Sequence, residues 1–408
     1  MNAKSVKKAL FAGIAGLGML GMVGSASAAV VDINIYGASA QYLFWNSAAM
    51  DFLLDQGCTN VGRAQTADGK NGITRGTCSG DTVYIRYTSK ASYDGIYAVK
   101  GQWNPLEAVA DHQCANQPAQ RLLADEATCT FTSTGDPGAC SGTKCMSVLI
   151  GASDVAGESF MQRSKGALSG PLGGTLQNRI FVGIDTSTLS NFRPVVVPFA
   201  FFANDTVTRN GAPITNIPRV QAVMIFSGQV DNWRDFGTEF VDLPIVQCLR
   251  HAGSGTHATL DFAVMRGNNW GGTLITLDKN NGGPPNAYFN DGSADEMKCI
   301  NGSGTWTGTG AIGYADADQS LTSYGNVVRL KYNGEEASKY NVVNGLYNFW
   351  SAQWLFTRAA DATSPWVVAL TNFASDATNI PLDKQAYWAS QSEMKYKKTT
   401  DKTYVQPK

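Results

Sequence analysis

Four times along this chain, a strand-like apolar segment leads into a turn of small polar residues, and a helix-like segment follows. The turns occupy residues 37–40, 88–92, 151–154 and 253–256, and each carries serine or threonine. Strands that alternate with helices predict parallel α/β sheets, because two parallel strands need a long crossover that usually contains a helix. The turns after parallel strands meet at one edge of a sheet, where α/β proteins bind their ligands. We therefore expect an α/β fold whose functional residues lie in these turns.

The chain is long enough, at 408 residues, for two lobes with separate cores. An apolar run at 193–203 predicts a core strand leading into the second lobe, and another at 346–356 predicts the return. The lysine-rich end after Met394 is expected to be a solvated tail. The predicted divisions are lobe 1 at 29–197, lobe 2 at 198–341, and the return to lobe 1 with a C-terminal tail at 342–408.

The first 28 residues have the pattern of an export signal. Three lysines precede an apolar, glycine-rich run, and Ala26-Ser27-Ala28 has the small residues that a signal peptidase accepts. The run is too short and too rich in glycine for a membrane-spanning helix, and no later stretch is long enough. We expect cleavage before Ala29 and a periplasmic or secreted protein without a direct membrane span.

The formal net charge of −1 argues against a general surface for nucleic acid or anionic membranes. Any recognition of an anion must therefore be local. A Gly-x-Gly-x-x-Gly match at 308–313 has no clear strand before it and no amphipathic helix after it, so we predict no dinucleotide site. The three histidines and the cysteines have no metal-ligand spacing. We expect neither a metal nor a cofactor.

All eight cysteines follow the predicted signal, and an even count in an exported protein predicts four disulfides. The polar, cysteine-rich residues at about 101–145 predict an irregular surface excursion stapled by some of them. The connectivity cannot be deduced from the sequence. Pairing between sequence neighbours is the simplest expectation, because short loops close easily. Those pairs are Cys58 with Cys78, Cys114 with Cys129, Cys140 with Cys145, and Cys248 with Cys299.

The turn Gly253-Ser254-Gly255-Thr256 is suited to an anion. Its small residues allow backbone amides and two hydroxyls to approach an anion at the positive end of a helix. Arg250, just upstream, can add a forked guanidinium contact. An ordinary helix cap is the alternative explanation for this turn alone. The similar turns at Ser39, at Ser89 or Ser92, and at Ser153 favour the anion site.

Five segments, in their order along the chain, resemble the periplasmic phosphate-binding proteins of ABC phosphate importers. The resemblance implies a two-lobed α/β periplasmic-binding-protein fold of type II, with the ligand in the cleft between the lobes. It also implies a binding protein rather than an enzyme, which captures inorganic phosphate or a similar tetrahedral oxyanion for the membrane subunits of an ABC importer. The segments are Gly37-Ala38-Ser39-Ala40, Gly151-Ala152-Ser153-Asp154, Ile225-Phe226-Ser227-Gly228 with Asn232-Trp233, Arg250-x-x-Gly253-Ser254-Gly255-Thr256, and Gly310-Ala311-Ile312-Gly313-Tyr314.

The same resemblance implies a set of ligand-binding residues. Within it, the carboxylate of Asp154 would accept the proton of hydrogen phosphate and repel fully ionised sulfate. This chain departs from the family pattern at two positions. It has Gln41 in place of threonine, and Ala252 in place of an aspartate that orients the arginine, so we expect Arg250 to be held less firmly. The implied contacts are Ser39, Ala40, Gln41, Ser89, Ser92, Asp154, Arg250, Ser254, Gly255 and Thr256.

Two other functions remain open at this stage. One is a phosphate-ester hydrolase with Ser254 or Asp154 as nucleophile. His251 and His257 flank Ser254, but the residue two before it is Ala252, so the pattern of a nucleophile elbow fails. The other is a surface or partner-binding protein that retains the fold without transport, which the fold alone does not exclude.

Overall fold

The computed structural model describes residues 28–105, 113–160, 163–164, 179–180, 182–266, 287–304 and 306–408. The predicted export signal thus lies outside the described residues, apart from its last position. In the ranges given, no helix combines the length and apolar character that crossing a bilayer requires.

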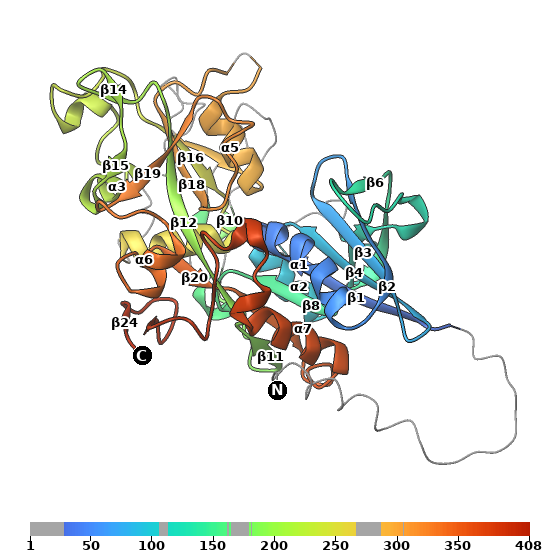
Figure 1. Ribbon diagram of the computed structural model, residues 1–408. Helices are drawn as coiled ribbons and strands as arrows, with labels where there is room; N and C mark the ends of the chain where they lie inside the picture. Colours follow the sequence, from blue (N-terminus) through green and yellow to red (C-terminus); the bar gives the residue numbers. More distant parts are fainter. Residues whose placement is uncertain are drawn as a thin grey trace, which may run out of the picture.

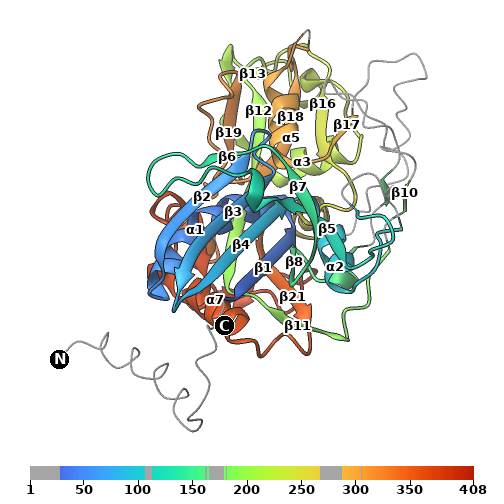
Figure 2. The same ribbon diagram turned by 90° about the vertical axis from the view of Figure 1, so that its right-hand side faces the viewer.

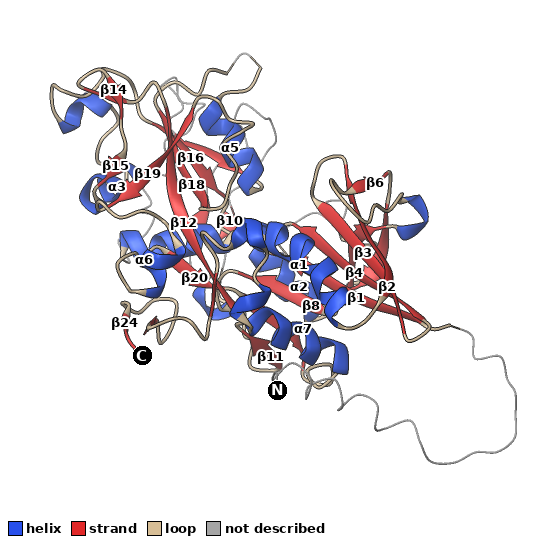
Figure 3. Cartoon of the chain, in the orientation of Figure 1, coloured by secondary structure: helices blue, strands red, loops and turns tan. Residues whose placement is uncertain are grey.

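The chain folds into two lobes, each built on its own eight-stranded sheet (Figure 1). After a quarter turn, the two sheets lie one above the other (Figure 2). Helices are distributed among the strands of both lobes (Figure 3). The predicted two-lobed α/β fold is confirmed. Its helices are α1 (Tyr42–Asp55), α2 (Ser92–Val99), α3 (Arg219–Phe226), α4 (Gly255–Leu260), α5 (Ser293–Asn301), α6 (Lys339–Val343) and α7 (Pro365–Ser375).

The sheet of lobe 1 is mixed. Its strand β1 pairs in parallel with β4 and β8, whereas β3 pairs antiparallel with both β2 and β4. Parallel pairing is confirmed for β1, β4 and β8. No strand was predicted at β2 or β3, which pair antiparallel because their short connections permit only hairpins. In spatial order the strands are β11 (Leu189–Phe192), β21 (Trp354–Arg358), β8 (Ile150–Ser153), β1 (Val30–Gly37), β4 (Asp81–Ser89), β3 (Asn71–Cys78), β2 (Thr59–Thr66) and β6 (Gly138–Cys140).

Helices α1 and α2 cover opposite faces of this sheet. Successive side chains of a strand point to opposite faces, so neighbouring residues of β1 contact different helices. Ile33 and Ile35 of β1 belong to the large core that includes α1, whereas Tyr36 packs with Ala98 of α2. Where a helical segment is predicted after the third turn, the described residues contain a 3-10 turn at Gly157–Ser159, and the continuation of the segment at Met161 lies outside the described residues.

The sheet of lobe 2 is centred on β12, whose ten residues are all buried. Strand β16 pairs in parallel with β17 and β18, while β12 is antiparallel to β18 and β19. In spatial order the strands are β15 (Asn216–Ile217), β19 (Val327–Tyr332), β12 (Val195–Asn204), β18 (Ala311–Asp316), β16 (Val246–Arg250) and β17 (Ala287–Asn290), while β20 (Trp350–Ala352) and β22 (Ala389–Ser390) pair with β12.

The chain passes between the two sheets where β11 leads into β12, where β20 leads into β21, and again after α7, because β22 returns to pair with β12. The division predicted at residue 197 falls inside β12, and the one predicted at residue 342 falls inside α6. Short two-stranded ribbons complete the described strands: β5 (Gln120–Ala124) with β7 (Thr143–Ser147), β9 (Arg163–Ser164) with β10 (Arg179–Ile180), β13 (Thr208–Arg209) with β14 (Ala212–Pro213), and β23 (Tyr396–Lys397) with β24 (Gln406–Pro407).

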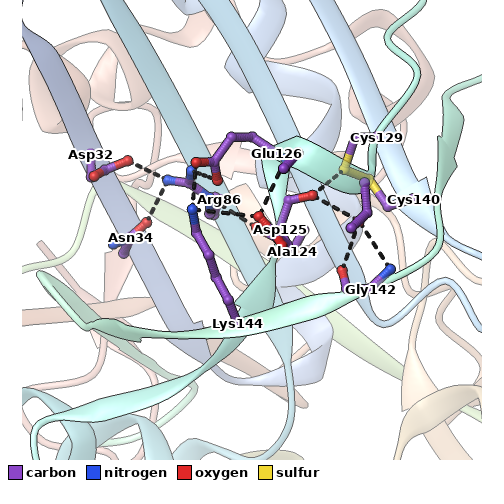
Figure 4. A network of polar contacts seen from close by, with 12 residues as sticks. Asp32, Asn34, Arg86, Ala124, Asp125, Glu126, Cys129, Cys140, Gly142 and Lys144 are labelled. Carbon is purple, nitrogen blue, oxygen red and sulfur yellow. Dashed lines mark hydrogen bonds and ion pairs between the residues drawn. A yellow bond between two sulfur atoms is a disulfide. The ribbon is translucent and has the colours of Figure 1, made fainter.

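The cysteine-rich excursion is more regular than predicted, because β5 and β7 form a hairpin beside β4. The buried guanidinium of Arg86, on β4, holds it in place (Figure 4). Arg86 Nε donates to the carbonyl of Ala124 (3.0 Å), and Nη2 pairs with Glu126 (2.7 Å). Nη1 pairs with Asp32 on β1 (2.5 Å), and Lys144 of β7 pairs with Glu126. The excursion is thus anchored to the sheet of lobe 1.

The C-terminal segment is attached to the body of the protein by polar contacts, although most of its residues after Met394 are exposed, so the predicted tail is solvated but not free. The carboxylate of Asp401 accepts hydrogen bonds from the amide of Ala156 (2.7 Å) and the hydroxyl of Ser159 (2.9 Å). Lys398 donates to the carbonyl of Trp350 and lies over its ring. These contacts could not be predicted from an apolar run in the sequence, because polar side chains make them.

The cysteines form four disulfides. The predictions of Cys58–Cys78 and Cys248–Cys299 are confirmed, while the other two are wrong. The remaining bonds are nested, with Cys129–Cys140 inside the segment closed by Cys114–Cys145. The reason is the β5–β7 hairpin, which pairs residues distant in sequence and brings Cys145 opposite Leu122. Four disulfides are typical of proteins from an oxidising compartment.

We expect the purified protein to show no free thiol when it is unfolded without a reducing agent, because all eight cysteines are paired. After reduction the same titration should find eight thiols per chain. Two or more thiols per chain before reduction would show that one of these disulfides does not form.

Candidate functional site

The carboxyl ends of the parallel strands of lobe 1 bring three of the predicted turns together. The amide of Lys90 donates to the carbonyl of Gly37 (2.7 Å), which joins the ends of β4 and β1. The amide of Asp154, after β8, donates to the hydroxyl of Ser92 (3.1 Å). Gly37 adopts φ +139°, and a Cβ there would lie 2.1 Å from the carbonyl oxygen of Ala152. Glycine is therefore required where these turns meet.

In lobe 2, the parallel strands β16 and β17 end side by side at Arg250 and Asn290. The fourth predicted turn follows β16 and leads into α4. Ser254 is the N-cap of this helix, and its hydroxyl accepts a hydrogen bond from the amide of His257 (3.3 Å). The turn after β17 leads into α5, which begins at Ser293.

The turns of the two lobes meet at Asp154. The hydroxyl of Thr256 donates to Oδ2 of Asp154 (3.1 Å) across the boundary between the lobes. Gly255 lies so close to lobe 1 that a Cβ would be 2.5 Å from the Ser92 hydroxyl oxygen and 2.6 Å from the Asp154 Cβ. A side chain at position 255 would separate the lobes, so this contact depends on glycine.

Arg250 is a buried cation that reaches both lobes. One of its terminal nitrogens, Nη1, donates to the hydroxyls of Ser39 in lobe 1 (3.0 Å) and Ser293 in lobe 2 (3.1 Å). The other, Nη2, donates to the main-chain carbonyl of Asp291 (2.8 Å). Among the described residues, no carboxylate forms an ion pair with Arg250. Two hydroxyls and a carbonyl thus contact Arg250 where the resemblance led us to expect a carboxylate, and the expectation that it is held less firmly stays a prediction.

Ala252 occupies an apolar contact between the lobes. It is fully buried in a cluster that contains Tyr93, Val155 and Phe160 of lobe 1 together with Phe262 of lobe 2. Burying a charged side chain among these apolar neighbours would be energetically unfavourable. The departure from the family pattern at this position therefore accompanies an apolar surface that joins the lobes.

We expect Ala252→Asp to lower the free energy of unfolding by at least about 1 kcal/mol, because the new carboxyl would be buried without a partner. Thermal or denaturant unfolding measures this loss. Ala212→Asp, at an exposed position of β14 in the same lobe, is the matched control and should change stability little. Equal stability of the two variants would contradict the apolar contact.

Asp154 is the acidic group of the site. Burial raises its pKa to about 6, although the hydrogen bond from Thr256 and the charge of Arg250 act in the opposite direction. Its Oδ1 has no hydrogen-bond partner among the described residues. The main-chain carbonyl of Asp154 accepts a hydrogen bond from Ser351 of the connecting segment. A buried carboxyl with a free oxygen can accept a hydrogen bond from a ligand that carries a proton.

Six of the ten predicted contact residues are brought together at the boundary between the lobes: Ser39, Ser92, Asp154, Arg250, Gly255 and Thr256. In the other four, the side chain or the main-chain amide has another contact within the protein. Ser254 acts as a helix cap, Ala40 lies in the hydrophobic core, and the amide of Ser89 donates to the carbonyl of Lys70.

The side chain of Gln41 is already occupied by the protein. Its amide nitrogen donates to the carbonyls of Ser153 (3.1 Å) and Trp354 (3.3 Å), and its oxygen accepts from the indole of Trp45 (2.9 Å). This side chain positions the turn after β8. Both polar atoms of the Gln41 side chain are therefore engaged within the protein and are not directed at a ligand.

Sequence reasoning missed Ser293. The segment Asn290-Asp291-Gly292-Ser293 resembles three of the four predicted turns, since glycine and serine follow a strand. That pattern could have identified it. The long Gly- and Asn-rich stretch before it concealed the short strand β17.

No family model matches this chain. Among solved structures, it is similar to a putative phosphate ABC transporter substrate-binding protein from Clostridium perfringens, with 15% identity and a TM-score of 0.49 over 87% of this chain and 98% of that one. It is also similar to an ABC-type phosphate transport receptor from Vibrio cholerae, with 14% identity and a TM-score of 0.44 over 87% and 98% of the chains. An ancestral soluble variant of the human phosphate binding protein gives 14% identity and a TM-score of 0.47 over 88% and 90%. At these identities and TM-scores we assign no function from the likeness.

Proposed function

We propose that this chain is an exported binding protein that captures inorganic phosphate, or a similar tetrahedral oxyanion, between its two lobes. One observation carries the proposal. Arg250 is a buried cation that donates to hydroxyls of both lobes and forms no ion pair with a described carboxylate. The carboxylates of Asp154 and Asp291 act on Arg250 only from beyond ion-pair distance, and its Nε has no hydrogen-bond partner among the described residues. A direct charge-assisted contact to an anionic ligand therefore fits this buried guanidinium.

The other groups at the site support an oxyanion that still carries a proton. The hydroxyls of Ser39 and Ser293, which accept from Arg250, can donate to oxygen atoms of a ligand, whereas that of Thr256 donates to Asp154. Asp154, beside them, is an acceptor and would be repelled by an anion without a proton to donate. Hydrogen phosphate offers both oxygen acceptors and one donor, whereas sulfate at neutral pH offers acceptors alone. Phosphate therefore fits the site better than sulfate.

Capture would serve delivery to the membrane subunits of an ABC importer. The disulfides are in keeping with this role, because they fit a periplasmic or extracellular location.

A hydrolase role for Ser254 has less support. The hydroxyl of Ser254 accepts the hydrogen bond that caps α4. The ring of His257 faces elsewhere, with Nδ1 2.5 Å from the hydroxyl of Tyr314. Burial and the nearby charges of His251 and Arg250 lower the pKa of His257 well below its ordinary value. A nucleophilic serine needs a base within hydrogen-bond reach, and this imidazole is directed at a tyrosine.

Thermal unfolding of protein freed of phosphate tests the proposal. A ligand present at a hundred times its dissociation constant stabilises the folded state by about 2.7 kcal/mol. We expect millimolar phosphate or arsenate to raise the unfolding temperature by several degrees at pH 8, and sulfate to leave it unchanged. The same shift with all three anions would argue against a site of this chemistry. Turnover of a chromogenic phosphate ester would instead favour the hydrolase.

A further inference from the structure

Lys90, which lies in the predicted turn at 88–92 but is not one of the implied contacts, joins the two lobes at the site. It follows Ser89 at the carboxyl end of β4, beside the end of β1. Its side chain crosses to lobe 2, where Nζ lies 3.4 Å from Oδ1 of Asp291. The side chain of Lys90 is only 7% exposed. The pair is therefore shielded from water on the lysine side, unlike an ordinary surface ion pair.

Asp291 connects Lys90 to Arg250. Its carboxylate pairs with Lys90, while its main-chain carbonyl accepts the hydrogen bond from Arg250 Nη2 (2.8 Å). Burial acts to raise the pKa of Asp291, yet its positive neighbours hold that pKa well below the ordinary range, so the carboxylate is ionised at neutral pH. These neighbours are Lys90, His251, Lys70 and Arg250.

Lys70 provides a natural comparison, because it comes from the same lobe and reaches the same acid. Its Nζ lies 3.8 Å from Asp291 and 3.4 Å from Asp295, and its side chain is 33% exposed. Pairs this exposed contribute little and are screened by salt. Lys90 and Lys70 thus differ in burial while sharing a partner.

We propose that Lys90 is a positioning residue of the anion site: its ion pair with Asp291 holds the two lobes together and fixes the segment that carries Arg250's hydrogen-bond acceptor. The role in anion binding rests on the proposed function above, whereas the role in closure does not.

The pair stabilises only the closed arrangement, since Lys90 belongs to lobe 1 and Asp291 to lobe 2. Removing Lys90 leaves Asp291 with the longer, more exposed pair to Lys70 and the charges of His251 and Arg250, so the closed site loses its most buried ion pair. In Lys90→Met the charge left behind is the negative one of Asp291, beside Arg250. That variant should therefore both favour the open form and repel an anion. Lys90→Arg keeps the positive charge and should retain both properties.

The experiment compares Lys90→Met, Lys90→Arg and Lys70→Met with the unchanged protein. Small-angle scattering without phosphate reports whether the lobes separate, and stopped-flow fluorescence reports the rates of phosphate binding and release. We expect Lys90→Met to be more extended without ligand and to bind phosphate at least tenfold more weakly, mainly through faster release. Lys70→Met should lose less than threefold, and Lys90→Arg should resemble the unchanged protein.

The double variant Lys90→Met with Asp291→Asn separates pairing from a general structural effect. If the two residues act as a pair, the double variant should be no more open than the more open single variant. Equal scattering and equal release rates for Lys90→Met and Lys70→Met would overturn the proposal. If the unchanged protein binds no phosphate, the scattering without ligand still decides whether Lys90 holds the lobes together.

Discussion

Replacing Arg250 with methionine should weaken phosphate binding at least about thirtyfold. Truncating one partner of a buried, hydrogen-bonded charge pair costs about 2–5 kcal/mol, and each 1.4 kcal/mol corresponds to a factor of ten in affinity. Arg250 is the group that reaches Ser39 in one lobe and Ser293 in the other, so methionine removes both the charge and a contact between the lobes. Titration calorimetry at neutral pH measures the loss.

Two further substitutions make this test specific. Arg234→Met removes a positive charge from the surface of lobe 2, where the side chain is 54% exposed and pairs with Asp242. This control should bind phosphate normally. Arg250→Lys retains the charge but lacks the planar fork, so we expect an intermediate affinity. If Arg250→Met unfolds at room temperature, Arg250→Lys carries the test. Binding by Arg250→Met that matches the Arg234→Met control would exclude Arg250 from the site.

Replacing Asp154 with asparagine should remove the discrimination between phosphate and sulfate. Phosphate then loses the charged acceptor for its proton. The loss of this hydrogen bond costs about 1.5–3 kcal/mol, or roughly ten- to hundredfold in affinity. The same change removes the negative charge that repels sulfate, and the new amide can donate to a sulfate oxygen. Phosphate binding should therefore fall while sulfate binding rises.

The pKa of Asp154 determines how the affinity for sulfate should change with pH. The pKa of Asp154 is raised to about 6 by burial, so the group is ionised above that pH and protonated below it. As the pH falls through about 6, the unchanged protein should gain affinity for sulfate, because the protonated carboxyl can donate a hydrogen bond. Asp154→Asn should bind sulfate equally at pH 5 and pH 8.

Calorimetry with both anions at both pH values checks the prediction. Asp136→Asn, at an exposed position of lobe 1, is the matched control and should behave as the unchanged protein does. A phosphate-to-sulfate ratio that is the same in Asp154→Asn as in the control would show that Asp154 does not select the ligand.

The parts of the site that could be predicted are those encoded in contiguous residues. Asp154 and Arg250 each stand at the end of an apolar strand, next to small residues that form a recognisable turn. Such local patterns place a side chain at a strand end before its neighbours are known. The meeting of these turns then follows from the parallel pairing of β1, β4 and β8.

The parts that could not be predicted depend on contacts between distant segments. Lys90 and Asp291 are 201 residues apart, and nothing in either local sequence indicates the pair. The same holds for Asp401, which reaches Ala156 from a segment that appeared to be a solvated tail. The nested disulfides required knowledge of the β5–β7 hairpin, whose strands are too short and polar to be recognised. In each case the missing information is tertiary.

The central claim is that the boundary between the lobes holds one phosphate ion on Arg250 and Asp154. Titration calorimetry of the purified protein at pH 8, after unfolding and refolding in phosphate-free buffer, tests it most directly. The account predicts one bound phosphate per chain, competition by arsenate, and no measurable heat with sulfate. The absence of phosphate binding, or binding that Arg250→Met leaves unchanged, would contradict it.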